Sequence, residues 1–358
     1  MEKYFTNSRF DLMAKLLYLK YYNFQFYIDL YKYHINTFNL AWEHPGKKVN
    51  INDFINSFNQ LITSFKNNGY LENKPITVGK NGVIINGAHR LVISYYNNIT
   101  PKFKFSERDG CNSYNYDFFL NRNNYWKRDK SIYPNLDIKY SDTMALEYLN
   151  IKSNIRPLIF FPITYQNFEK NKPNILKIFN KNDNLYYFKK IKDKELQWNN
   201  LIAESYRGEK WIGGIFPNDS CGGKLKLCYK DDYTLFYLFE FYNLNDAVKM
   251  KTEIRNILKF EKHSLHIPDT LEESFRIASC ILNINSLSFL NYTLTPKDKD
   301  ILTNLFKIKN DSNLCWDLEL NQKINDKDII NNPEKYFYIN GYKILIPYSY
   351  YLLYSYAP

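Results

Sequence analysis

The spacing of apolar residues in the first 70 positions predicts two helices with a strand between them. Over residues 8–31, apolar side chains recur every three to four positions, which gives a helix one apolar face. The same period returns over 51–67. Between these helices, residues 33–40 predict a short strand, and the segment 42–46, which contains Pro45 and Gly46, predicts a turn.

A hairpin followed by a helix is predicted next. Residues 76–78 and 83–85 are short apolar runs typical of strands, and Lys80-Asn81-Gly82 between them suits a tight hairpin turn. A helix is expected over 90–97, and one more strand over 101–105. This part of the chain therefore predicts a small sheet with helices packed around it.

The second half of the chain predicts a further mixture of strands and helices. Residues 106–135 are polar and rich in Asn, Tyr and Arg, so we interpret them as a linker or an excursion. The run 235–241 is almost continuously apolar, as in a strand that is buried on both faces. The expected strands are 157–163, 185–191 and 225–242, and the expected helices are 246–260 and 270–283.

These elements predict an α+β protein with several parts. Residues 1–31 are expected to form an N-terminal helix, 32–105 a first domain, and 136–358 a mixed α+β domain. The composition agrees with a folded chain, because 45% of the 358 residues are hydrophobic and 18% are aromatic.

Cysteine usage and hydropathy indicate a cytoplasmic setting without a membrane span. Five cysteines are present and none forms a Cys-x-x-Cys pair, which argues against a disulfide scaffold and against a structural zinc site of that kind. Residues 1–31 lack the apolar core of a signal peptide, and no run of 18 uncharged apolar residues occurs.

The net charge of +11, from 48 basic and 37 acidic residues, has two interpretations. A basic chain can bind nucleic acid or a membrane surface. The lysines, however, are spread along the whole length without a run of five basic residues, and the chain is rich in the residues that an AT-biased genome favours. The spread favours composition over a dedicated basic surface.

Candidate chemistry centres on Asn86-Gly87-Ala88-His89-Arg90, where a predicted strand ends and a helix begins. A helix N-terminus offers unpaired N–H groups and positive dipole to an anion, and a glycine lets the backbone approach it closely. Arg90 adds a planar donor suited to phosphate oxygens, and His89 can donate to phosphate or move a proton near neutral pH. The pattern therefore predicts a phosphate site.

The order of elements around this loop resembles the ParB/sulfiredoxin superfamily over residues 32–105. Its members include partition proteins that bind CTP and DNA, sulfiredoxins, nucleases and free-serine kinases. The resemblance implies that the loop holds nucleotide phosphates. Ala88 stands where a sulfiredoxin has its reactive cysteine, and His89-Arg90 is closer to the kinase-like branch than to the Arg-Arg pair of partition proteins.

In the kinase-like branch a carboxylate soon after the first strand acts as general base, and Glu43 occupies that place. Asn86 departs from the pattern, because kinase-like members commonly have Asp there, and this weakens a metal or base role at that position. The plainer alternatives are a solvated Glu43 in a turn, and an ordinary turn at Asn86-Gly87 with Arg90 exposed.

The second half resembles uncharacterised proteins of capsule and other glycan loci over residues 185–345. In those relatives the C-terminal part resembles a nucleotidyltransferase with an Asp-x-Asp pair, and here the matching place reads Asp317-Leu318-Glu319. Two carboxylates two positions apart on a strand point the same way and can hold Mg²⁺. The Gly-Ser element expected upstream is absent, so we interpret residues 300–358 as a degenerate remnant.

His263 and His266 are spaced as two zinc ligands on one helical face would be. Pro268 argues against a regular helix there, and no third ligand is evident. The sequence favours a hydrogen-bonded histidine pair over a metal site.

Together these features predict a nucleotide-dependent phosphotransferase that uses ATP or another nucleotide with Mg²⁺ and acts on a sugar, polyol or amino acid in capsule or surface-glycan biosynthesis. Residues 86–90 would bind the phosphates, and Glu43 and His89 would be catalytic. The alternative is a DNA-binding or nuclease-type protein, although no helix-turn-helix is evident after residue 105. A third possibility is a catalytically silent scaffold of glycan assembly.

Overall fold

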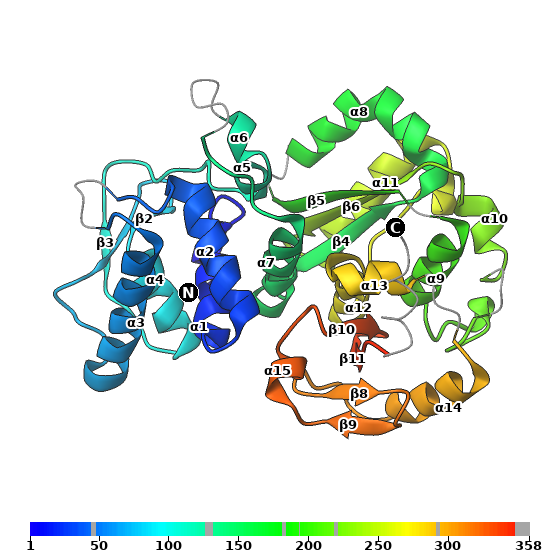
Figure 1. Ribbon diagram of the computed structural model, residues 1–358. Coiled ribbons are helices and arrows are strands. Elements are labelled where there is room, and N and C mark those ends of the chain that lie inside the picture. The colour runs from blue at the N-terminus through cyan, green and yellow to red at the C-terminus, as the bar shows by residue number, and fades with distance from the viewer. Residues whose placement is uncertain are drawn as a thin grey trace. The chain divides into compact units, whose positions relative to one another are not determined.

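The computed structural model describes residues 1–43, 48–125, 132–180, 184–192, 194–217, 221–290 and 294–347. The chain divides into two compact units, Met1–Lys152 and Ser153–Pro358. Each unit contains helices and small sheets, so the predicted α+β class is confirmed (Figure 1). Among the described residues, no helix is both long enough and apolar enough to cross a membrane.

Unit 1 consists of helices around one small sheet. Its helices are α1 (Asp11–Tyr21), α2 (Gln25–Asn39), α3 (Ile51–Asn68), α4 (Ala88–Tyr96), α5 (Tyr116–Leu120), α6 (Arg122–Tyr125) and α7 (Ile138–Ile151), preceded by the one-turn 3₁₀ helix η1 (Glu2–Tyr4). Its strands are β1 (Ile76–Val78), β2 (Ile84–Asn86) and β3 (Phe103–Phe105), in the order β2-β1-β3. Strand β1 pairs antiparallel with β2 and parallel with β3.

The start of unit 1 differs from the prediction of one helix and a strand. The single helix predicted over 8–31 is interrupted between Tyr21 and Gln25, so two helices form there. The predicted strand 33–40 is wrong, because α2 continues through Asn39. The buried residues of α2 follow a helical period, and this pattern outweighs the aromatic and β-branched content that suggested a strand. The helix ends at Leu40, which has a left-handed backbone (φ 55°).

The hairpin and the helices on either side of it agree with the prediction. Helix α3 begins with a capping box between Asn50 and Asp53, and its buried side chains recur at helical spacing. The turn between β1 and β2 contains Gly82 at φ +77°, a conformation that glycine adopts without strain. Part of the turn predicted at 42–46 lies outside the described residues.

The segment 106–135, expected to be a linker or an excursion, contributes to the core of unit 1. Phe118 and Phe119 in α5 are buried, and the Phe119 ring packs against Phe10. Unit 1 also extends past the boundary expected near 135, because Tyr148 in α7 donates a hydrogen bond to the Thr6 carbonyl (3.1 Å).

Unit 2 contains two four-stranded sheets. Its strands are β4 (Ile155–Phe160), β5 (Leu185–Lys192), β6 (Tyr233–Glu240), β7 (Leu265–His266), β8 (Cys315–Asp317), β9 (Gln322–Ile324), β10 (Tyr336–Ile339) and β11 (Tyr342–Leu345). Its helices are α8 (Tyr165–Asn180), α9 (Glu195–Ser205), α10 (Lys224–Cys228), α11 (Leu244–Leu258), α12 (Leu271–Leu282), α13 (Ile284–Phe289), α14 (Pro296–Leu305) and α15 (Lys327–Ile330). One-turn 3₁₀ helices lie at η2 (Pro162–Thr164), η3 (Lys210–Ile212) and η4 (Glu261–His263).

The first sheet of unit 2 is antiparallel throughout, in the order β5-β6-β4-β7. Leu235, Tyr237 and Phe239 of β6 alternate onto one face, where they pack in a single core cluster with α8 and α11 (Figure 1). The residues between them are also buried, which confirms the expected two-sided burial of this run. The predicted strand 225–242 was too long at its start, where α10 forms instead.

The second sheet has the order β10-β11-β8-β9 and packs against α13 and α14. Strand β8 ends at Asp317, whose Oδ1 accepts a hydrogen bond from the Leu320 N–H (3.0 Å) in the following turn. The expectation that Asp317 and Glu319 share one strand face is therefore wrong: Asp317 is buried and caps a turn, and Glu319 is exposed in that turn.

Candidate functional site

A cavity of about 560 Å³ lies within unit 1, and it collects the site residues predicted from the sequence. Its lining includes Glu43 and the complete loop Asn86, Gly87, Ala88, His89 and Arg90. Residues of α1, α2 and α3 complete the wall. Glu43 and the Asn86–Arg90 loop, more than 40 positions apart in the sequence, thus line the same cavity. The volume of this cavity falls in the range of small-molecule sites.

The loop presents an uncapped helix N-terminus to this cavity. Strand β2 ends at Asn86, Gly87 is the N-cap in a left-handed conformation (φ 95°), and α4 begins at Ala88. Among the residues that the structure describes, no side chain caps the first turn of α4. The first N–H groups of a helix have no partner within it, so they are available to an anion.

Gly87 is held closely by its neighbours. A Cβ atom built on it would lie 3.2 Å from the Ile76 Cα atom and 3.0 Å from Nη2 of Arg90. The absence of a side chain at Gly87 therefore allows β1, the loop and the Arg90 guanidinium to pack together.

Because of this close packing, Gly87→Ala should lower the free energy of unfolding by more than the strain of a positive φ alone would. The matched control is Gly82→Ala in the hairpin, since Gly82 also has a positive φ (+77°) but no atom within 4 Å of a Cβ. We expect Gly82→Ala to lower the free energy of unfolding by roughly 1–2 kcal/mol, and Gly87→Ala by about 1 kcal/mol more. Urea unfolding of both variants measures the difference, and equal losses would contradict the close packing.

Arg90 is tethered at one end of its guanidinium. Nη2 donates a hydrogen bond to the Pro75 carbonyl (3.2 Å). The buried Nε has no hydrogen-bond partner within the part of the chain that the structure describes. An anion in the cavity would supply the missing acceptor.

His89 is a neutral hydrogen-bonding group in this site. Its Nε2 lies 2.9 Å from the Tyr31 hydroxyl, and its ring packs edge-on against Phe58 (4.4 Å between centroids). Burial, and then Lys15 and Lys48, hold the pKa of His89 well below its usual 6.5. Burial also raises the pKa of Tyr31, so the Tyr31 hydroxyl keeps its proton at neutral pH.

Glu43 stands at the cavity in an ion pair rather than alone in solvent. Its Oε2 lies 2.7 Å from Nζ of Lys48, and the two residues form an isolated β-bridge. The Glu43 side chain is 45% exposed, so a ligand in the cavity can reach it. Lys48 also lines the cavity.

Sequence reasoning missed a buried ionic cluster on the same wall, formed by Arg9, Asp11 and Lys15. Asp11 accepts two hydrogen bonds from Arg9 (2.7 and 2.9 Å) and one from Lys15 (2.6 Å). Arg9 also donates to the Ile84 carbonyl in β2, two residues before the loop begins. The i,i+4 pair of Asp11 and Lys15 within an otherwise apolar helix was the available signal.

Cations exceed carboxylates along the cavity wall. Among the described lining residues, five are basic and two are acidic: Arg9, Lys15, Lys48, Lys74 and Arg90 against Asp11 and Glu43. An excess of one sign in a recessed site attracts ligands of the opposite sign. The cavity is therefore suited to an anion such as a phosphate ester.

The two histidines singled out in unit 2 each lie beside a different polar partner. Nδ1 of His263 lies 3.6 Å from Sγ of Cys228, and Nε2 of His266 lies 2.9 Å from Oε1 of Glu273. The two histidines belong to a 3₁₀ turn and a strand rather than to one helix. Within the described ranges, no group of three or more His, Cys, Asp or Glu is arranged to hold a metal ion.

Comparisons with known proteins leave the ligand to be inferred from the cavity. No family model matches the chain, and neither the curated proteins nor the solved structures give a significant match. The positive wall, the open helix N-terminus and Arg90 are the features from which a function can be inferred.

Proposed function

We propose that unit 1 binds a nucleotide through its phosphates and transfers a phosphoryl group to a small hydroxyl compound. The observation that carries this proposal is that the uncapped N-terminus of α4, Arg90 and Glu43 share one cavity with an excess of cations. The resemblance of the strand–turn–helix at Asn86–Arg90 to the kinase-like branch of the ParB/sulfiredoxin superfamily supports the phosphate-binding part of this assignment. The strand that the resemblance placed before Glu43 is part of α2, so the role of Glu43 rests on its place at the cavity.

Each residue has a defined role in the proposed transfer. The N–H groups of the first turn of α4 and the Arg90 guanidinium bind phosphate oxygens, and Lys48 adds positive charge. The acceptor hydroxyl attacks the terminal phosphorus, its proton passes to the Glu43 carboxylate, and the bond from that phosphorus to the leaving nucleoside diphosphate breaks. His89, held by Tyr31, donates or accepts a hydrogen bond without carrying charge.

Mg²⁺ would enter with the nucleotide, because this ion is commonly bound by substrate phosphates and only one or two protein oxygens. The ion would neutralise charge on the phosphates. The acceptor class we propose is a sugar, polyol or amino acid, with capsule or surface-glycan assembly as the setting.

Nucleotide binding tests this proposal through Arg90→Ala. We expect ATP, ADP or CTP to bind the full chain, and Arg90→Ala to weaken the binding by roughly 10- to 100-fold, because a hydrogen bond to a charged group contributes about 1.5–3 kcal/mol. Titration calorimetry measures both dissociation constants. Arg108→Ala is the matched control, since Arg108 is exposed in the same unit and does not line the cavity.

The alternatives give different results in the same experiment. Unchanged nucleotide affinity in Arg90→Ala would remove the loop from the proposed site. Steeply salt-dependent binding of duplex DNA without nucleotide binding would favour the DNA-binding alternative. A chain that binds neither would favour a silent scaffold.

A further inference from the structure

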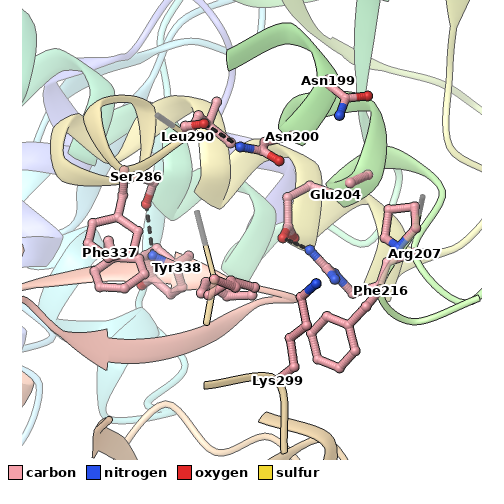
Figure 2. A pocket seen from close by; sticks show the side chains of 15 residues that line it. Asn199, Asn200, Glu204, Arg207, Phe216, Ser286, Leu290, Lys299, Phe337 and Tyr338 are labelled. Atoms are coloured by element: carbon pink, nitrogen blue, oxygen red, sulfur yellow. Dashed lines mark hydrogen bonds and ion pairs between the residues drawn. The ribbon is translucent and has the colours of Figure 1, made fainter. Parts of the chain in front are cut away.

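A second cavity, of about 160 Å³, lies within unit 2 and is separate from the proposed nucleotide site (Figure 2). Its walls come from α9, α13, α14 and β10, with Phe216 and Pro217 from the loop that follows η3. One wall is apolar and the other carries charged and amide groups. This combination is typical of sites that hold an amphipathic small molecule.

The apolar wall is built on two aromatic rings. Phe289 of α13 and Phe337 of β10 are stacked, with 3.4 Å between ring centroids, and both are buried. Leu290 and Leu294 extend the same surface. A ligand that fills this side must therefore be apolar, and a flat ring fits beside stacked rings.

The polar wall contains a buried ion pair, and the opposite charges of its two residues cancel. Glu204 and Arg207 form a salt bridge in which each side chain is only 5% exposed. The other carboxylate oxygen of Glu204 accepts the Asn340 N–H (2.8 Å), and Arg207 also donates to the Ile215 carbonyl (2.5 Å). Nε of Arg207 is buried and has no hydrogen-bond partner among the residues described.

Lys299 adds a positive charge that this pair does not balance. It lies in α14 and lines the cavity, and Figure 2 shows its side chain directed toward Glu204 and Arg207. Lys299 is exposed, so it lies at the open side of the cavity rather than in its buried part. The lining residues that the structure describes thus carry a net charge of +1, from Arg207 and Lys299 against Glu204.

We infer that this cavity binds a small aromatic carboxylate. Its volume of about 160 Å³ is close to that of cavities that accept a benzene ring, about 150 Å³. The ring would lie against the apolar wall at Phe289 and Leu290, and the carboxylate would pair with the Lys299 ammonium. A single net positive charge suits a monoanion better than a phosphate ester.

Benzoate is the probe for this site, with benzamide as its neutral counterpart. Titration followed by protein NMR or by ligand-observed saturation transfer should show that benzoate binds about tenfold more tightly than benzamide. Lys299→Met should remove this preference. Lys297→Met is the matched control, because Lys297 is exposed on the same helix and does not line the cavity.

A second variant tests the location without changing charge. Ala203 of α9 is buried at the cavity wall, so Ala203→Val should narrow the space and weaken benzoate and benzamide together. Arg90→Ala should leave benzoate binding unchanged, which separates this site from the nucleotide site. Equal affinity for the two probes in the unsubstituted protein, or no binding of benzoate at millimolar concentration, would overturn the inference.

Discussion

Replacing Asp11 with Asn is expected to lower the free energy of unfolding by about 3–5 kcal/mol, because it leaves two buried cations without their counter-ion. Arg9, Asp11 and Lys15 all have less than a tenth of their side chains exposed. The Asp11 carboxylate is bound by both cations at 2.6–2.9 Å. Urea unfolding followed by circular dichroism measures the loss.

The matched control for this prediction is Asp29→Asn. Asp29 pairs with Lys32 at 3.8 Å on the surface of α2, with about a third of its side chain exposed (33%). Such a pair contributes about 0–1 kcal/mol, so this variant should be nearly as stable as the unsubstituted protein. In a Lys15→Met background, Asp11→Asn should cost less, because one of the two cations is gone. Equal losses for Asp11→Asn and Asp29→Asn would contradict the buried cluster.

The lowered pKa of Asp11 predicts how the stability of the fold depends on pH. Burial acts to raise the pKa of Asp11, but Arg9 and Lys15 outweigh it and hold that pKa far below the usual 3.8. The unfolded chain takes up a proton near its ordinary pKa while the folded chain does not. The stabilisation is therefore complete at neutral pH and is lost as the pH falls below about 4. Melting temperatures between pH 7 and pH 2 should fall more steeply for the unsubstituted protein than for Asp11→Asn.

Features that depend on neighbouring residues were predictable from the sequence. The apolar spacing of α3 gives the same buried face in the structure, and the turn at Gly82 lies between the expected strands. The strand–turn–helix around Gly87 could be recognised because a glycine, a helix start and an arginine lie within five positions. The expectation that Glu43 lies near that loop was based only on the family resemblance, because no local sequence pattern links the two segments.

Features that depend on packing between distant segments were not predictable. Helix α1 is buried nearly all round, and this explains why Lys15 must be paired, but its sequence looks like that of an ordinary amphipathic helix. Segment 106–135 looks polar, yet Phe118 and Phe119 anchor it in the core. At Asp317 the spacing to Glu319 suggested a strand, and the chain turns there instead because the carboxylate caps the following N–H.

The remaining large effect concerns Glu43, whose proposed role as general base has a specific kinetic signature. Glu43 holds Lys48 at 2.7 Å, so its removal would affect either proton transfer or the placement of a cation that binds phosphate. These two roles differ in which constant changes. Loss of a base acts on the chemical step and lowers kcat, whereas a displaced Lys48 weakens nucleotide binding and raises KM.

Glu43→Gln is therefore expected to lower kcat by roughly 10²- to 10⁴-fold with little change in the KM for nucleotide, because the amide fits the same space but cannot take up the acceptor's proton. The assay follows transfer of labelled γ-phosphoryl from ATP to serine, glycerol or glucose. Glu72→Gln is the control, since Glu72 pairs with Lys102 at 3.8 Å, is 84% exposed and does not line the cavity. A raised KM with unchanged kcat would reassign Glu43 to holding Lys48, because a group that moves the proton must act on the rate of the bound complex.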